Sequence, residues 1–189
     1  MKTLILFALF AALACTTAPT APAAAVQEAP KPASPSPQHM WLQQLVGEWD
    51  STCEAMMGPD SPPMKMESTE SVRSIGGLWV LAEGKWSNGG EPMTTLMTLG
   101  YNAEQNAYVG TWVDSMQTHM WVYRGTLDEA KKTLTLEATG PRMDDPSKMA
   151  KYRDAITIVS ADHKQLTSSV LGDDGKWTQF MTGNYHRKK

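Results

Sequence analysis

The sequence predicts an all-β domain that folds as an up-and-down antiparallel β-barrel of about nine or ten strands. Apolar and polar residues alternate in segments such as 93–101 and 132–140, as is typical of half-buried strands. Turn residues recur at short intervals, so consecutive strands must be antiparallel neighbours. A meander of this length tends to close, because closure removes its exposed edges. A two-sheet sandwich is the alternative.

The chain begins with a segment typical of export signals. Residues 1–14 carry one cation, Lys2, followed by an apolar run that is shorter than the roughly 20 residues of a membrane-spanning helix. We therefore expect a signal peptide that is removed. The segment Ala12-Leu13-Ala14-Cys15 resembles the lipobox of bacterial lipoproteins, which makes Cys15 the expected lipid anchor. The same residues also fit an ordinary A-x-A cleavage site, so plain secretion is the alternative.

Residues 15–38 are expected to form a disordered tether. This segment holds six of the twelve prolines and almost no large apolar residue, so it cannot build a core. A tether after a lipidated cysteine predicts an exported, membrane-anchored lipoprotein that faces the periplasm or the cell exterior. The membrane would then be contacted through the N-terminal lipid only.

The barrel domain is expected over residues 39–189, a length that suits one core. A short helix over His39–Val46, ended by Gly47, would close one end of the sheet. Trp49 follows it and should be buried against the barrel floor. Turn signals include 102–106, 128–131 and Ala161–Lys164. The expected strands are 47–56, 63–73, 77–87, 92–101, 106–116, 118–127, 132–140, 150–160, 165–172 and 176–187.

Charge and cysteine usage limit the classes of partner. Without Lys2, the chain holds 16 cations and 20 anions, with no basic run beyond Arg187–Lys189, which argues against a nucleic-acid partner. Cys53 is the one cysteine besides Cys15, so we expect no internal disulfide and a buried thiol. The sequence predicts no cofactor and no obligate protein partner.

Several motifs resemble those of the bacterial domain-of-unknown-function family 1579. The most specific are Leu99-Gly100-Tyr101-Asn102, the segment Thr111–Met116, and the segment Tyr185–Lys188, and the similarity spans roughly Met40 to Lys188. The resemblance implies a lipocalin-like (calycin-like) barrel and no assigned activity. Family members commonly carry Asp where this chain has Asn102, which argues against a catalytic use of that position.

One aromatic hairpin is the main candidate site. Trp112 and Asp114 share one face of their strand, while His119, Trp121 and Tyr123 share one face of the next. These faces can pair across a turn near residues 117–118. Such a surface either packs as barrel wall or lines an open cavity that contacts a ligand.

Arg153 is a further ligand candidate. It alternates with Tyr152 and Asp154 on its strand. An inward Arg153 would need a carboxylate partner such as Asp114 and could bind an anionic head group, whereas an outward Arg153 would be an ordinary surface charge.

Metal binding and catalysis are the alternatives to a carrier function. The pairs Met56/Met57 and Met64/Met66 could bind Cu(I) through soft thioether ligands, although methionine more often fills cores. Asp114 or His119 could act as a general acid or base in an enzyme. Ser115 faces away from Asp114, which argues against a nucleophilic triad.

The sequence therefore favours binding over catalysis. The expected function is that of a cell-envelope lipoprotein which binds or carries a small apolar or amphipathic molecule in a barrel cavity.

Overall fold

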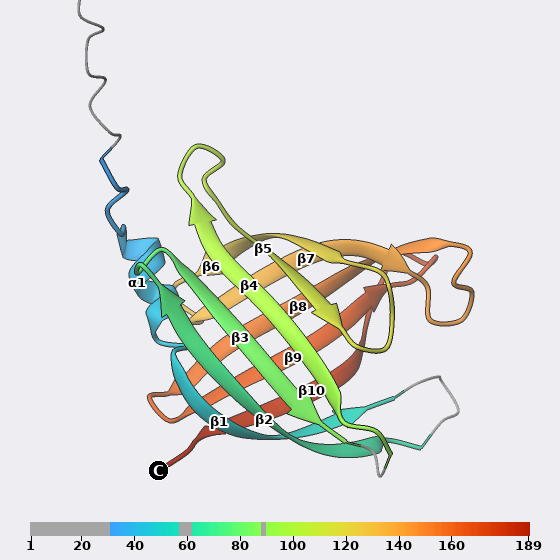
Figure 1. Ribbon diagram of the computed structural model, residues 1–189. Coiled ribbons are helices and arrows are strands. Elements are labelled where there is room, and N and C mark those ends of the chain that lie inside the picture. The colour runs from blue at the N-terminus through green and yellow to red at the C-terminus, as the bar shows by residue number, and fades with distance from the viewer. Residues whose placement is uncertain (1–30, 57–61, 88–89) are drawn as a thin grey trace, which may run out of the picture. The chain divides into compact units, whose positions relative to one another are not determined.

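The computed structural model describes residues 31–56, 62–87 and 90–189. The signal peptide and anchor expected at residues 1–14 and at Cys15 lie outside these ranges, as does most of the expected tether. The described chain from residue 33 onward forms a closed barrel of ten antiparallel strands with one short helix (Figure 1). The up-and-down barrel is therefore confirmed, and the sandwich alternative is wrong.

The elements follow the sequence in simple order. They are α1 (Pro37–Gln43), β1 (Gly47–Ala55), β2 (Met64–Ile75), β3 (Trp79–Trp86), β4 (Met93–Asn102), β5 (Ala107–Asp114), β6 (Trp121–Asp128), β7 (Thr133–Pro141), β8 (Met149–Ser160), β9 (His163–Leu171) and β10 (Trp177–Arg187).

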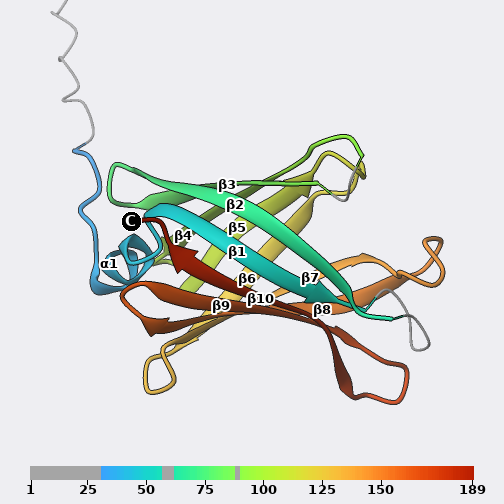
Figure 2. The ribbon, with the colours of Figure 1, turned by 90° about the horizontal axis from the view of Figure 1, so that it is seen from below.

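Each strand pairs with its successor, and β1 closes the barrel by pairing with β10. The closing register places Ser51 opposite Tyr185 and Cys53 opposite Gly183. Because every strand has two partners, closure satisfies the backbone groups that an open sheet would expose at its edges. The chain turns back so that the end of β10 lies beside α1 (Figure 2), where Arg187 Nη1 donates to the carbonyl oxygen of Val46 at 2.7 Å.

The helix begins earlier and ends earlier than the sequence suggested. Pro37 occupies the first turn, where a missing N–H costs nothing, and the backbone N–H of Ser36 donates to His39 Nδ1 at 3.0 Å. The expected cap at Gly47 is wrong, because the helix already ends near Gln44. Gly47 instead opens β1 with φ of +138°, where any side chain would meet the guanidinium of Arg187.

Two turns differ in length from the expectation. The turn predicted over Ala161–Lys164 contains only residues 161 and 162, because β9 already begins at His163. A register irregularity between Ile158 and Ser160 allows this tight connection. The β5–β6 turn is longer than expected, since β6 starts at Trp121. Lys164 consequently belongs to a strand and not to a turn.

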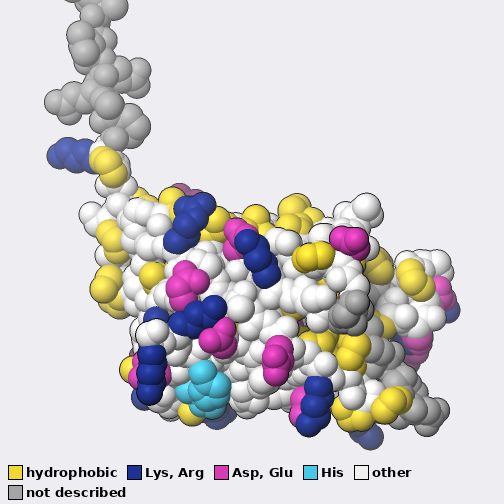
Figure 3. All heavy atoms as spheres, turned by 60° about the horizontal axis from the view of Figure 1, so that its bottom comes forward, with side chains coloured by type: hydrophobic (Ala, Val, Ile, Leu, Met, Phe, Trp, Pro, Cys, Tyr) yellow, Lys and Arg dark blue, Asp and Glu magenta, His cyan; other side chains and the backbone are white. Residues whose placement is uncertain are grey.

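The apolar core occupies the half of the barrel that lies toward α1. Its completely buried side chains are those of Trp49, Leu42, Leu99, Leu134, Leu136 and Val80. Leu42 and Leu45 extend from the helix segment into this cluster, so α1 closes that end of the barrel. The outer wall seen in Figure 3 carries Lys and Arg side chains interspersed with Asp and Glu.

Candidate functional site

Part of the barrel interior keeps surface that solvent can reach. Strand register turns Met66, Met97, Leu166 and Tyr185 toward the interior, yet all four are only half-buried. In a closed barrel, inward side chains that remain accessible must line a lumen. The lumen is therefore the candidate site.

A charged pair crosses this lumen near its floor. Lys164 Nζ from β9 forms an ion pair with a carboxylate oxygen of Glu70 from β2, and the side chains are 8% and 18% exposed. Strands β1 and β10 lie between β9 and β2 in the sheet, so the pair spans the interior instead of following the wall. Pairing is what makes two buried charges tolerable, since each alone would carry a large desolvation cost.

Aromatic rings and a second cation surround the Lys164 ammonium. Its Nζ lies 4.6 Å from the ring centre of Trp49 and 4.9 Å from that of Tyr185. The guanidinium of Arg187 also lies over Trp49, at 4.2 Å. Burial lowers the pKa of Lys164, Glu70 opposes this effect, and nearby Arg187 adds to it. Lys164 is therefore a buried amine that lies among aromatic rings and beside a carboxylate.

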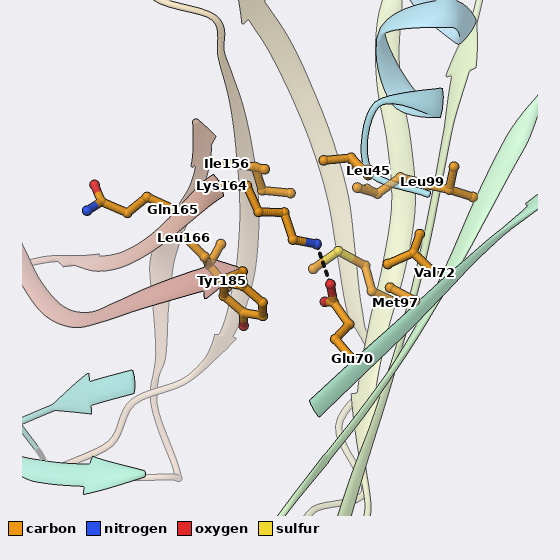
Figure 4. A pocket seen from close by; sticks show the side chains of 12 residues that line it. Leu45, Glu70, Val72, Met97, Leu99, Ile156, Lys164, Gln165, Leu166 and Tyr185 are labelled. Carbon is orange, nitrogen blue, oxygen red and sulfur yellow. Dashed lines mark hydrogen bonds and ion pairs between the residues drawn. The ribbon is translucent and has the colours of Figure 1, made fainter. Parts of the chain in front are cut away.

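A small cavity adjoins the pair. Its volume is about 30 Å³, which is room for roughly one or two water molecules. Figure 4 shows Leu45, Leu99, Val72 and Met97 on one side of the Lys164–Glu70 contact, with Leu166 and Tyr185 on the other, whereas Gln165 points away. The side chains that line the cavity are therefore mostly apolar, and the Lys164–Glu70 ion pair is the charged group among them.

A second polar group lies farther along the lumen. The hydroxyl of Tyr123 donates a hydrogen bond to Asp154, and Ser168 also hydrogen-bonds that carboxylate. Burial raises the pKa of Asp154 above its usual range, against the opposing effect of these hydrogen bonds. Burial first and the adjacent carboxylate second also raise the pKa of Tyr123 well above its usual value. Asp154 is thus a second buried carboxyl group in the barrel interior, and Tyr123 and Ser168 hold it by hydrogen bonds.

Three of the residues predicted as ligand contacts lie on the inner face. Trp112 and Trp121 face each other across β5 and β6, and Tyr123 follows Trp121 on the same face. Trp121 makes edge contacts with His119 at 5.0 Å and Tyr152 at 4.7 Å. Its Nε1 is buried without a hydrogen-bond partner among the described residues. The predicted aromatic surface is thus present on the inner face, and the Nε1–H of Trp121 is a hydrogen-bond donor that no described residue uses.

Asp114 and His119 serve the hairpin itself. The Asp114 carboxylate accepts hydrogen bonds from the backbone N–H groups of Met116 and Gln117, at 2.6 and 2.9 Å, and from Gln117 Nε2 at 2.7 Å. His119 Nε2 contacts the carbonyl oxygen of Thr139 at 3.2 Å. The two side chains have different partners, so no acid–base pair is assembled between them.

Arg153 lies on the outside of the barrel, which is the surface-charge alternative of the two that the sequence left open. It forms an ion pair with Glu137 at 2.7 Å, and its guanidinium stacks over Trp177 at 3.9 Å. The inward residue is its neighbour Asp154, because the phase of β8 also buries Tyr152 and Ile156.

The predicted methionine site is divided between the rim and the lumen. Met56 is exposed beyond the end of β1, whereas Met64 and Met66 face inward opposite Ala55 and Cys53. Met57 lies outside the described residues. Over the described ranges, no group of three His, Cys, Asp or Glu side chains forms a candidate metal site. Cys53 is a buried free thiol, as predicted, and burial raises its pKa.

Sequence reasoning missed Glu70, Lys164, Asp154 and Tyr185, although a signal for them was present. In β2, Glu70 shares the strand phase of Met64, Met66 and Val72. A charged residue that falls on the apolar phase of a strand indicates a polar group inside the barrel. The same argument applies to Asp154, in phase with Ile156.

The sequence matches the family described as a protein of unknown function (DUF1579) over residues 34–187. The chain belongs to the DUF1579 family. No curated protein matches it. The DUF1579 barrel is similar to the S-type phycobiliprotein lyase CPES from Guillardia theta, with 13% identity, a TM-score of 0.56, and coverage of 82% of this chain and 99% of the other.

The DUF1579 barrel is also similar to Rv2717c from M. tuberculosis. The two chains share 13% identity and a TM-score of 0.55, over 82% of this chain and all of the other. At this level of identity the similarity shows the fold, which is the lipocalin-like barrel that the resemblance implied. Among the described residues, no helix is long and apolar enough to span a bilayer.

Proposed function

We propose that this DUF1579 domain binds and carries a small apolar or amphipathic molecule in its lumen. The observation that carries the proposal is the accessible surface of inward side chains such as Met97, Leu166 and Tyr185 inside a closed barrel. Apolar surface that faces a water-filled space favours any apolar guest that displaces the water. Methionine side chains can adjust to guests of different shape.

The charges of the lumen favour a guest whose polar end is uncharged. Glu70 already neutralises Lys164, so an anionic head group at the floor would compete with Glu70 and leave one carboxylate unpaired. A hydroxyl or carbonyl group would instead accept a hydrogen bond without adding charge. The free Trp121 Nε1–H is a second donor to such a group. The similar phycobiliprotein lyase barrel supports the proposal only through the shared fold.

Titration of delipidated protein with dodecanol, dodecanoate and a short-chain quinone should change tryptophan fluorescence in a saturable way, with the neutral probes binding more tightly than dodecanoate. Trp121→Phe keeps an aromatic ring but removes the N–H donor. It should weaken binding of the quinone by about two- to tenfold, the equivalent of one neutral hydrogen bond. The measurement is the dissociation constant from the fluorescence titration.

Trp79→Phe is the matched control. Trp79 is 40% exposed and its ring packs over Gly100 on the outer face, so its loss should leave the dissociation constant unchanged. The absence of a saturable response to every probe would show that the lumen is merely barrel interior, and the carrier proposal would fail.

We further propose that the carrier domain is held at a membrane in the cell envelope. The support is the sequence of residues 1–15, in which a short apolar run ends at Cys15. Cys15→Ser should move the protein from the membrane fraction to the soluble envelope fraction while its thermal melting is unchanged. Membrane association that persists in the processed Cys15→Ser protein would contradict lipid anchoring.

A further inference from the structure

The lumen contains an amine that the carrier function alone does not require. Lys164 reaches across the barrel from β9, and its Nζ borders the small cavity described above (Figure 4). Exposed lysines of this chain, such as Lys65 and Lys148, point into water with side chains 79% and 69% exposed. Lys164 differs from them because its surroundings are apolar and aromatic.

We propose that Lys164 captures apolar aldehydes that enter the lumen, as a covalent imine. This inference rests on the proposed carrier function, since the guest must first enter the barrel. The ligand class is an aldehyde with an apolar tail, whose carbonyl end fits beside Nζ. The roughly 30 Å³ of free space admits only that reacting end, so the tail must displace water and shift Met97 or Leu166, both of which are half-buried.

Glu70 supplies what the reaction needs. The Lys164 ammonium gives one proton to the Glu70 carboxylate, and the free amine attacks the carbonyl carbon to form a C–N bond. The carbonyl oxygen takes a proton from the nitrogen, which gives a neutral carbinolamine. Glu70 then returns its proton to the hydroxyl group, which leaves as water. The products are a protonated imine, the Glu70 carboxylate and one water molecule, so atoms and charge balance.

The product keeps the electrostatic arrangement of the floor. A protonated imine carries the same single positive charge as the ammonium that it replaces, next to the same carboxylate. The rings of Trp49 and Tyr185, whose centres lie 4.6 and 4.9 Å from Nζ, can face either cation. Burial also lowers the pKa of Lys164 and thereby favours the reactive neutral amine. Capture therefore adds no uncompensated charge to the interior.

The test is reductive trapping of the full chain with dodecanal and sodium cyanoborohydride, read by intact mass and peptide mapping. We expect the addition of one dodecyl group at Lys164, at a rate about tenfold or more above that of any exposed lysine, since the lumen holds the aldehyde beside the amine. Lys164→Met should lose this addition while it still binds dodecanol. The matched control Lys148→Met should label as the wild type does.

The outcomes separate the two proposals. Labelling spread evenly over the lysines, or an unlabelled Lys164 in protein that binds dodecanol, overturns imine capture and leaves the carrier function intact. Failure to bind either dodecanol or dodecanal overturns both. Saturating dodecanol should slow labelling of Lys164 and leave Lys148 unaffected, and the opposite pattern would show that labelling takes place outside the lumen.

Discussion

Replacement of Glu70 by glutamine is expected to lower the free energy of unfolding by about 3–5 kcal/mol near neutral pH, the usual cost of leaving a buried charge without its partner. Lys164 is 8% exposed, and the adjoining cavity admits only roughly one or two water molecules, so water replaces the lost carboxylate poorly. The nearby Arg187 guanidinium increases the cost, because it places a like charge close to the unpaired ammonium. Urea denaturation at a fixed pH measures the change.

The deficit of Glu70→Gln should depend on pH in a defined direction. Burial lowers the folded-state pKa of Lys164, and the substitution removes the carboxylate that opposes this effect. Above the folded-state pKa and below the unfolded-state pKa of about 10.4, the unfolded chain binds more protons than the folded chain. Stability therefore rises with pH in that interval. The deficit should be largest on the acidic side of the interval and shrink as pH approaches about 10.

Two variants control for this interpretation. Glu54→Gln breaks the exposed pair between Glu54 and Lys65, which should change stability by less than about 1 kcal/mol. The double variant Glu70→Gln/Lys164→Met removes both charges and should recover most of the loss, since no unpaired charge is left in the interior. A double variant as unstable as Glu70→Gln would locate the effect in packing at residue 70 and not in the unpaired charge.

The fold followed from sequence because each of its signals is local. Alternation places one face of a strand inside, and turn residues join neighbours, so ten strands and their closure needed no knowledge of distant contacts. The aromatic wall at Trp112 and Trp121 followed for the same reason, since the two residues belong to one hairpin. The start of α1 was less accessible, because it depends on the contact of Ser36 with His39.

The polar floor could not be predicted in the same way, because it joins residues far apart in the chain. Glu70 and Lys164 are separated by most of the barrel and meet only after closure. The turn predicted over Ala161–Lys164 also placed Lys164 outside any strand. Its inward orientation follows only once β9 is known to begin at His163. For Arg153 and Asp154, alternation alone left the phase undecided, and the buried neighbours Tyr152 and Ile156 fix it.

Replacement of Trp49 by alanine is expected to lower the free energy of unfolding by about 3–5 kcal/mol, the range for truncating a fully buried large aromatic side chain. Trp49 is 1% exposed, and its burial at the barrel floor was predicted from the sequence. Its Nε1 donates to the carbonyl oxygen of Leu45 at 2.9 Å and thereby ties β1 to the segment that follows α1. Thermal and urea melting curves measure the loss.

Two variants divide the contributions of the Trp49 ring and its hydrogen bond. Trp49→Phe keeps most of the buried ring but leaves the Leu45 carbonyl without its donor, so it should cost about 1–3 kcal/mol. Trp79→Ala removes an indole that is 40% exposed on the outer wall, and it should cost less than Trp49→Ala because that ring already contacts water. Equal losses for Trp49→Ala and Trp79→Ala would contradict a floor built on Trp49. That result would also mean that the positions of Lys164 and Arg187, whose cations lie over the Trp49 ring, do not depend on this ring.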